Sequence, residues 1–260
     1  MNSKGPQRIV CLTEEPTEIL YLLGEERRIV GITVYTVRPP EAKERFPVVS
    51  AFVDGSVKRI CELKPDLIIG FSDIQSDLAA KLIKANQQVL IFNQRSIEEI
   101  LEVILTIGRI VSAEKKAEKL VEGYRISISK AKDNGDSLKK RPRVYFEEWD
   151  KPTFSAIRWV SELIEIAGGV DIFSEKSHGK LAVEREIQWS DVVERDPEVI
   201  LASWCGKPVD IDSIRKRPGW ASISAIKNDR IYELDPSIIL QPGPASLTDG
   251  LKVIQSLIQA

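Results

Sequence analysis

A long helical pattern between Ser96 and Lys132 constrains this chain of 260 residues more than any other feature. Apolar residues recur there every three or four positions, and no proline interrupts them. They are Ile97, Ile100, Leu101, Ile104, Ile107, Val111, Ala117, Leu120, Val121, Tyr124 and Ile128. A helix of about 37 residues would be roughly 55 Å long, which exceeds the diameter of an ordinary domain. We therefore expect one rigid helix over residues 96–133 that joins two bodies; a long helix lying against a single domain is the alternative.

Short β-branched segments alternate with helical segments on both sides of this stretch. The expected strands are 8–12, 29–34, 47–50, 67–70 and 89–92 before it, and 143–146, 199–202 and 230–234 after it. Strands that alternate with helices form mostly parallel sheets with both faces covered. We expect an α/β fold of two lobes, each with a mostly parallel sheet: an N-terminal lobe of residues 1–95 and a C-terminal lobe of residues 134–260.

The charge and cysteine content exclude several classes of protein. Acids and bases are intermixed to a net charge of -2, and only residues 139–143 form a short basic run, so we expect no nucleic-acid binding. No apolar run approaches the roughly 20 residues of a membrane span, so we expect no membrane insertion. The cysteines, Cys11, Cys61 and Cys205, are odd in number and far apart, which is typical of reduced thiols.

The N-terminal residues predict a cytoplasmic protein if Met1 is the native start. The apolar segment from Ile9 to Leu12 is too short for the core of a signal peptide, and no cleavage site precedes it. A chain from which a leader had been removed would look similar, and such a protein would be periplasmic or lipid-anchored.

Aromatic residues follow several of the expected strands. Tyr35, Phe52 and Phe71 do so in the first half, and Trp149 and Trp204 do so in the second. Ligands of open α/β sheets bind beyond the carboxyl ends of the strands. Large flat side chains gathered there suit a broad, mostly apolar ligand with polar edges, although burial of each aromatic in a core is an equal alternative.

The residue patterns of catalysis are missing from the sequence. The single histidine, His178, lies in a polar segment where nothing marks it as a base or a metal ligand. No Gly-x-Ser-x-Gly, P-loop or Gly-x-Gly-x-x-Gly stretch is present. Cys205, with the cation Lys207 two residues on, has a small chance of binding a metal, but a buried structural thiol is the commoner role. We expect a binding protein without catalytic cofactor or metal site, not an enzyme.

Several motifs together resemble class III substrate-binding proteins of ABC importers. Those of the whole superfamily are Arg8-Ile-Val-Cys-Leu-Thr, Thr17-Glu18-Ile-Leu, Gly24 and Leu63-Lys-Pro-Asp-Leu-Ile-Ile. Those similar to the cobalamin (vitamin B12) branch are Glu147-Glu148-Trp149 with Pro152 and Ser155, Arg158-Trp-Val-Ser-Glu-Leu, Ala167-Gly-Gly-Val-Asp-Ile-Phe, Arg217-Pro-Gly-Trp and Gln241-Pro-Gly-Pro. The resemblance covers nearly the whole chain, from Arg8 to Leu257.

The resemblance implies non-catalytic binding of cobalamin or a related corrinoid in a cleft between the lobes. Carried over by position, the ligand-binding residues are Tyr35, Phe52, Phe71, Trp149, Ser155, Trp204 and Gln241, with Cys205 as a remote candidate for an axial metal ligand. Two of the first-lobe aromatics are Phe where the B12 importer protein has Trp, and Pro236 replaces another aromatic. The alternatives are a ferric-siderophore or haem receptor, for which Tyr35 is the axial candidate, then a metal chelatase, then a structural module.

The resemblance also bears on a membrane partner. Importer proteins of this family carry a glutamate on each lobe that pairs with permease arginines. In the first lobe it lies seven residues before the Pro of Leu63-Lys-Pro-Asp, and in the second it lies seven residues before Pro197 of the similar segment Arg195-Asp-Pro-Glu. Here Lys58 and Ser190 stand at these positions. Because a charge reversal would repel a basic surface, docking to a permease is doubtful, and a cytoplasmic carrier, store or sensor is the expectation.

Overall fold

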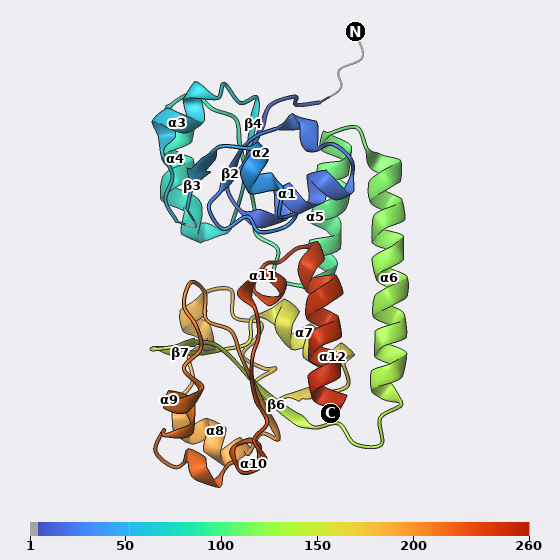
Figure 1. Cartoon of the computed structure of the whole chain (residues 1–260), viewed down its shortest axis with the longest axis vertical. Helices are drawn as coiled ribbons and strands as arrows, with labels where there is room; N and C mark the ends of the chain where they lie inside the picture. The colour runs from blue at the N-terminus through green and yellow to red at the C-terminus, as the bar shows by residue number, and fades with distance from the viewer. Residues whose placement is uncertain (1–4, 52, 260) are drawn as a thin grey trace. The chain divides into compact units, whose positions relative to one another are not determined.

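The computed structural model describes residues 5–51 and 53–259, and these fall into two compact units (Figure 1). Unit 1 comprises Met1–Gln94 and Glu98–Gly123, and unit 2 comprises Arg95–Ile97 and Tyr124–Ala260. Each unit is built on its own sheet, which confirms the expected fold of two α/β lobes with mostly parallel sheets. Among the residues described, no helix has the length and apolar character needed to cross a membrane.

The sheet of unit 1 has the strand order β3-β2-β1-β4-β5, and all neighbouring strands are parallel. The strands are β1 (Ile9–Cys11), β2 (Ile29–Thr33), β3 (Val48–Ser50), β4 (Leu67–Phe71) and β5 (Val89–Phe92). The connecting helices are α1 (Glu14–Leu22), α2 (Ala42–Arg45), α3 (Val57–Glu62) and α4 (Ser76–Lys84), with 3₁₀ turns at Glu26–Arg28 and Asp73–Gln75. Because the strands are parallel, the loops that follow them all lie at one edge, the carboxyl edge.

Unit 2 has a sheet of order β10-β9-β6-β7, with β8 paired to β6. Its strands are β6 (Arg143–Asp150), β7 (Thr153–Ser155), β8 (Val170–Asp171), β9 (Val199–Ala202) and β10 (Ile231–Glu233). Its helices are α7 (Arg158–Ile166), α8 (Trp189–Arg195), α9 (Ile211–Arg215), α10 (Ser224–Lys227), α11 (Pro236–Ile239) and α12 (Leu251–Gln259), with 3₁₀ turns at Ala182–Arg185 and Trp220–Ser222 and a π-helical turn at Ser246–Gly250. Only β7 is antiparallel, so β6 and β7 form a hairpin that extends past Glu147, the last β6 residue paired with β9.

The apolar runs of the sequence become the interiors of the two sheets. In unit 1, Val10, Leu12, Ile60, Ile68 and Leu82 form one buried cluster between the sheet and its helices. In unit 2, the buried cluster contains Tyr145, Phe173, Trp204 and Trp220 among aliphatic residues of β9 and α9. Strands covered on both faces require continuous rather than alternating apolar residues, which explains runs such as Val199–Ala202.

The expected single helix over residues 96–133 is wrong, because two helices occupy this stretch. Helix α5 (Ile97–Ile110) ends at a turn, and α6 (Glu114–Asp136) begins after it. At the turn, Ser112 adopts a left-handed conformation with φ 58°, and Gly108 lets α5 approach Ala117 so closely that an added Cβ would lie 2.4 Å from the Ala117 Cβ. A long helix of 23 residues does exist as α6, whose residues up to Gly123 belong to unit 1 and whose remainder belongs to unit 2.

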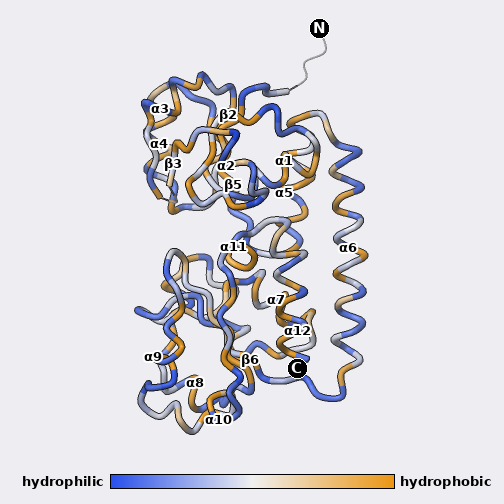
Figure 2. The backbone as a smooth tube through the Cα atoms, in the orientation of Figure 1, coloured by the Kyte–Doolittle hydropathy of each residue, from blue (hydrophilic) through white to orange (hydrophobic). Residues whose placement is uncertain are grey.

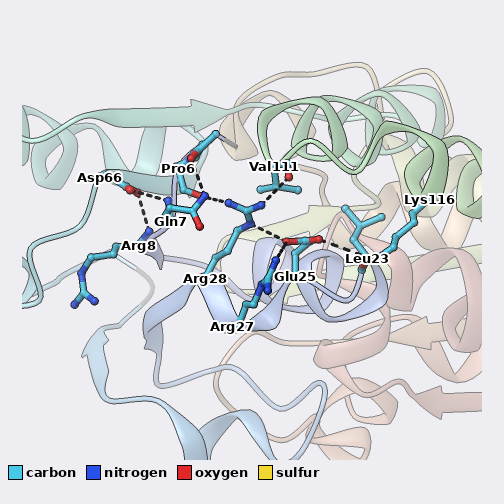
Figure 3. A network of polar contacts seen from close by, with 11 residues as sticks. Pro6, Gln7, Arg8, Leu23, Glu25, Arg27, Arg28, Asp66, Val111 and Lys116 are labelled. Atoms are coloured by element: carbon cyan, nitrogen blue, oxygen red, sulfur yellow. Dashed lines mark hydrogen bonds and ion pairs between the residues drawn. The ribbon is translucent and has the colours of Figure 1, made fainter. Parts of the chain in front are cut away.

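The turn after α5 is held by side chains from distant parts of unit 1 (Figure 3). The buried guanidinium of Arg28 donates to the carbonyls of Val111, at 3.0 Å, and Pro6, at 2.6 Å, and pairs with Glu25 at 2.8 Å. The ammonium of Lys116 donates to the carbonyl of Leu23 at 2.6 Å. The apolar pattern continues through the turn, and Figure 2 shows hydrophobic residues along α5 and alternating hydrophilic and hydrophobic residues along α6. Periodicity alone therefore could not reveal the break.

Candidate functional site: the carboxyl edges of the two sheets

The carboxyl edge of unit 1 exposes large apolar side chains, a set that we call the apolar edge. Its members are Val34, Tyr35 and Val37 after β2, Val53 after β3 and Ile74 after β4, and each is between 39% and 51% exposed. Loops place these residues at the ends of parallel strands, where ligands of α/β sheets bind. Soluble proteins rarely expose several large apolar side chains at one edge without a function, so this edge is a candidate binding surface.

Neutral polar groups fix the loops beneath the apolar edge. The side chain of Gln75 accepts the backbone N–H of Phe71 at 3.0 Å and donates to the carbonyl of Leu12 at 3.3 Å, which ties the ends of β4 and β1 together. The hydroxyl of Ser50 donates to the same carbonyl at 3.4 Å. Phe71 itself is 5% exposed. Buried backbone groups at the strand ends thus find partners without any charge.

One buried acid, Glu15, lies in the first turn of α1 at the same edge. It is 3% exposed, and among the described residues no hydrogen bond of standard geometry reaches either carboxylate oxygen. Burial raises the pKa of Glu15 to about 7, the nearby Thr13 hydroxyl opposes the shift, and Glu18 adds to it. Burial also raises the pKa of the neighbouring Cys11 thiol to about 12. At neutral pH, Glu15 is therefore close to half protonated, since an isolated buried carboxylate is disfavoured.

The carboxyl edge of unit 2 is organised around a fully buried acid, Glu147 of β6. Its carboxylate pairs with both terminal nitrogens of Arg217, at 2.5 and 2.8 Å, and accepts the hydroxyl of Tyr145 at 2.9 Å and the indole N–H of Trp204 at 3.2 Å. The central carbon of the Arg217 guanidinium lies over the rings of Trp189 and Trp220, at 4.9 and 4.5 Å from the ring centroids. A buried ion pair is tolerated best when its remaining hydrogen-bonding positions are filled, and here Tyr145 and Trp204 fill those of the carboxylate.

The ionisation of this cluster follows from its burial and its pairing. Burial lowers the pKa of Arg217, but the hydrogen bonds and charge of Glu147 outweigh this effect, so the pKa lies above its ordinary value. Burial, followed by the negative charge of Glu147, raises the pKa of Tyr145 well above its ordinary value. Arg217 is therefore charged, and Tyr145 is a neutral donor, throughout the physiological range.

A second charged group, Lys207, lies beside Trp149 and Trp204. The ammonium is 4.3 Å from the Trp149 ring centroid and 4.7 Å from that of Trp204, and it pairs with Asp150 at 2.7 Å. Burial raises the pKa of Asp150, but the hydrogen bond and the charge of Lys207 lower the pKa by more than burial raises it. The net shift is downward. The loop after β9 thus places a cation against both indoles.

The hairpin of β6 and β7 is fixed by a third ion pair, between Arg185 and Glu148. One terminal nitrogen of Arg185 donates to Glu148 at 2.9 Å, and the other contacts both Glu148 and the carbonyl of Ser155, the latter at 2.7 Å. The hydroxyl of Ser155 donates back to the carbonyl of Arg185 at 3.1 Å. The segment that leads to Arg185 carries two exposed apolar side chains, Leu181 and Val183, which are 47% and 63% exposed. At the hairpin tip, a surface hollow of about 320 Å³ is lined by residues 150–153 and 186–190.

The residues predicted from the sequence have different environments in the structure. In unit 1, Tyr35 belongs to the apolar edge, Phe71 lies buried at the end of β4, and Phe52 lies outside the described residues. In unit 2, Trp149 and Gln241 are half-buried, Trp204 and Ser155 are buried, and Cys205 is exposed. Unit 2 brings Trp149 and Trp204 together on Lys207, whereas Ser155 belongs to the Arg185 contact. Their roles toward a ligand stay predictions.

Sequence reasoning missed several residues of both edges. In unit 1, the exposed Val34, Val37 and Ile74 escaped because an apolar residue in a loop gives no signal of its exposure. In unit 2, Glu147 and Arg217 lie in motifs that the sequence analysis used only for the resemblance, and their pairing spans 70 residues. No group of three His, Cys, Asp or Glu side chains suited to a metal occurs among the described residues, and His178 is exposed.

Comparisons with known proteins place the chain in a family. Residues 9–238 match the family model described as periplasmic binding protein. An uncharacterized ABC transporter substrate-binding lipoprotein of Bacillus subtilis, YvrC, is 28% identical over 269 residues, which cover 98% of this chain and 81% of the relative. The vitamin B12-binding protein of Vibrio cholerae is 26% identical over 248 residues, which cover 93% of this chain and 85% of the relative.

A solved structure shares the fold of the whole chain. The periplasmic heme-binding protein RhuT of Roseiflexus sp. RS-1, in its apo form, has a TM-score of 0.81 at 24% identity, with 98% of this chain and 100% of that chain covered. The resemblance to class III substrate-binding proteins is thereby confirmed. The family consists of binding proteins, so the expectation of a non-enzyme agrees with it. Because the family model matches most of its length, the chain belongs to the periplasmic binding protein family.

Proposed function

We propose that this protein binds cobalamin or a related corrinoid as the substrate-binding component of an ABC importer. The observation that carries the proposal is the apolar edge of unit 1, where Val34, Tyr35, Val37, Val53 and Ile74 stand exposed at the ends of parallel strands. A corrin is a broad, mostly apolar ring with a polar periphery, and exposed apolar and aromatic groups suit its face. The similarity to the vitamin B12-binding protein of Vibrio cholerae supports this ligand class.

We assign ligand contacts by unit. Unit 1 would supply Tyr35, Phe52 and Phe71 together with the newly found apolar residues of its edge. Unit 2 would supply Trp149, Ser155, Trp204 and Gln241, with Cys205 as a remote axial candidate. The burial of Trp204 and Ser155 favours a supporting role for these two, because side chains already engaged by Glu147 and Arg185 hold their neighbours in place.

Haem is the second candidate ligand. The likeness to the heme-binding protein RhuT supports it, and Tyr35 offers a phenol that is 42% exposed among apolar side chains. Tyrosine is one of the residues that hold haem iron in proteins. Haem and corrins share the broad apolar face but differ in their periphery, since haem carries carboxylates and cobalamin carries mainly amides.

We base the proposed partner and location of the protein on its relatives rather than on its first residues. The lipoprotein relative of Bacillus subtilis supports a place outside the cytoplasm, and the relatives give no support to a cytoplasmic carrier, store or sensor. Lys58 on α3 is 86% exposed, and Ser190 on α8 is exposed. Asp191, next to Ser190, accepts the backbone N–H of Gln188 and so caps α8. Docking to a permease, if it uses these helices, would need other acids than in the B12 importer.

A titration of the purified protein tests the ligand. Aquocobalamin and haem are added separately while the visible spectrum and the heat of binding are recorded. We expect saturation near one equivalent of aquocobalamin, with weaker binding of haem. Saturable haem binding in the absence of corrinoid binding would replace the proposed ligand by the second candidate, and a shifted haem spectrum that is lost in Tyr35→Phe would identify the axial residue.

A further inference from the structure

Lys207 lies over the rings of Trp149 and Trp204, which the sequence analysis expected to contact a ligand ring. Trp149 and Trp204 follow strands β6 and β9, and their faces at this edge meet the Lys207 ammonium at 4.3 and 4.7 Å. Trp204 is only 2% exposed, and its N–H is bonded to Glu147. The side chain of Lys207, in contrast, is 39% exposed. The cation rather than the indole of Trp204 is therefore the group that unit 2 presents to solvent here.

The hydrogen-bonding capacity of this ammonium is not used up by its neighbours. An ammonium has three donors, and among the described residues only Asp150 accepts one of them, at 2.7 Å. The indole faces attract the positive charge but are weak acceptors. The contacts with Asp150 and both rings hold a long, flexible side chain in one position, which removes much of the entropy cost that a lysine pays on binding.

We propose that Lys207 binds an anionic oxygen group of the ligand, such as a phosphodiester or a carboxylate, and so selects ligands that carry one. This inference rests on the proposed function, because it names the chemistry that unit 2 recognises on that ligand. Trp149 and Trp204 then act as positioning residues for the ammonium. Asp150 shares the cation and fixes its direction, and the ligand oxygen takes the remaining donors.

The test compares two corrinoids that differ in the anionic group. Cyanocobalamin carries a phosphodiester in its nucleotide loop, whereas dicyanocobinamide lacks the phosphodiester and the base of that loop. Affinities of both are measured by calorimetry for the wild type, Lys207→Met, Lys207→Arg and Lys252→Met. Lys252 is an exposed lysine of α12 whose ammonium lies 3.9 Å from the carboxylate of Asp249, so its variant controls for the loss of one surface charge.

We expect Lys207→Met to weaken cyanocobalamin binding about tenfold, with dicyanocobinamide unchanged, because one charge-assisted hydrogen bond is lost. Lys207→Arg should keep most of the preference, and Lys252→Met should keep all of it. Equal weakening of both corrinoids, or of neither, would overturn the inference while leaving the proposed function intact.

If the wild type binds neither corrinoid, the proposed function fails, and the same variants are compared on haem and its dimethyl ester, which lacks free carboxylates. A selective loss of haem binding in Lys207→Met would then support the anion site. An equal effect on both forms, or no binding of either, would overturn it.

Discussion

The two units use the same strand edge in different ways. Unit 1 leaves apolar side chains exposed and holds its loops chiefly with the neutral Gln75 and Ser50, together with an ion pair between Glu18 and Arg38. Unit 2 buries most of its aromatic side chains and holds its loops with ion pairs, which are Glu147 with Arg217, Glu148 with Arg185 and Asp150 with Lys207. The comparison teaches that the carboxyl edge of a mostly parallel sheet can present either an apolar surface or a charged one.

The difference has a structural origin in the strands. In unit 1 all neighbouring strands are parallel and a connecting segment follows the end of each, so the apolar edge is built from residues of these connections. In unit 2, β6 continues beyond its pairing with β9 and turns back as β7. The extended hairpin brings additional polar backbone and side chains beyond the sheet, and these need partners when they are buried. Ion pairs and indole N–H groups supply those partners.

The largest expected effect tests the ionic support of unit 2. Arg217→Met leaves the fully buried Glu147 without its cation, which should lower the free energy of unfolding by about 3–5 kcal/mol. The measurement is urea denaturation followed by tryptophan fluorescence. All five tryptophans, Trp149, Trp159, Trp189, Trp204 and Trp220, belong to unit 2, so the signal reports this unit.

A neighbouring arginine provides the control for this variant. Arg215 pairs with Asp229 at the surface, and Arg215→Met should cost less than about 1 kcal/mol. The double variant Glu147→Leu with Arg217→Met should recover part of the loss, because it removes the unpaired charge. Similar losses for Arg217→Met and Arg215→Met would show that unit 2 does not depend on its buried pair.

The next effect concerns Glu15, a buried acid of unit 1. The pKa of Glu15 is about 7 in the folded protein against an ordinary value of 4.5. Between these values the folded state keeps a proton that the unfolded chain has lost, so stability falls as the pH rises through this window and levels off above it. Across this window the free energy of unfolding falls by about 3 kcal/mol.

Glu15→Gln should remove this pH dependence. Urea denaturation is followed by far-UV circular dichroism at pH 5 and pH 8, and the variant should gain stability relative to the wild type on going from pH 5 to pH 8. The neighbouring Cys11 thiol stays protonated over this range and does not add to the trend, while Glu18 is paired with Arg38 and Arg28 with Glu25. The exposed Glu44 of α2 is the matched control. A parallel pH dependence in the wild type and Glu15→Gln would contradict the assigned shift.

The fold could be predicted from local patterns because parallel strands and their helices are written in continuous apolar runs. The two sheets confirm this for strands such as Val199–Ala202 and Ile29–Thr33. The turn at Ser112 could not be predicted. No glycine or proline lies between the end of α5 at Ile110 and the start of α6 at Glu114, and the contact with Val111 that holds the turn comes from Arg28, 83 residues away in the sequence.

The candidate site could be predicted only as a location. That ligands bind beyond the strand ends follows from topology, and Tyr35, Trp149 and Trp204 do lie in these loops. Exposure depends on how each loop folds back, which periodicity does not encode. Lys207 covers the ring of Trp204, whereas Val34 and Val37 are 43% and 39% exposed, and these outcomes depend on tertiary contacts.

The smallest expected effect in free energy addresses the function of the apolar edge. Val34→Asp places a charge on a surface that we propose to contact a mostly apolar ligand, and it should weaken corrinoid binding at least tenfold, or about 1.4 kcal/mol. Ile83→Asp on α4 is the matched control, because Ile83 is 60% exposed in the same unit but lies outside the apolar edge. Both variants should stay within about 0.5 kcal/mol of wild-type stability, since they change exposed side chains. Equal affinities for the two variants in calorimetry would remove the apolar edge from the binding site and leave the charged edge of unit 2 as the surface that recognises the ligand.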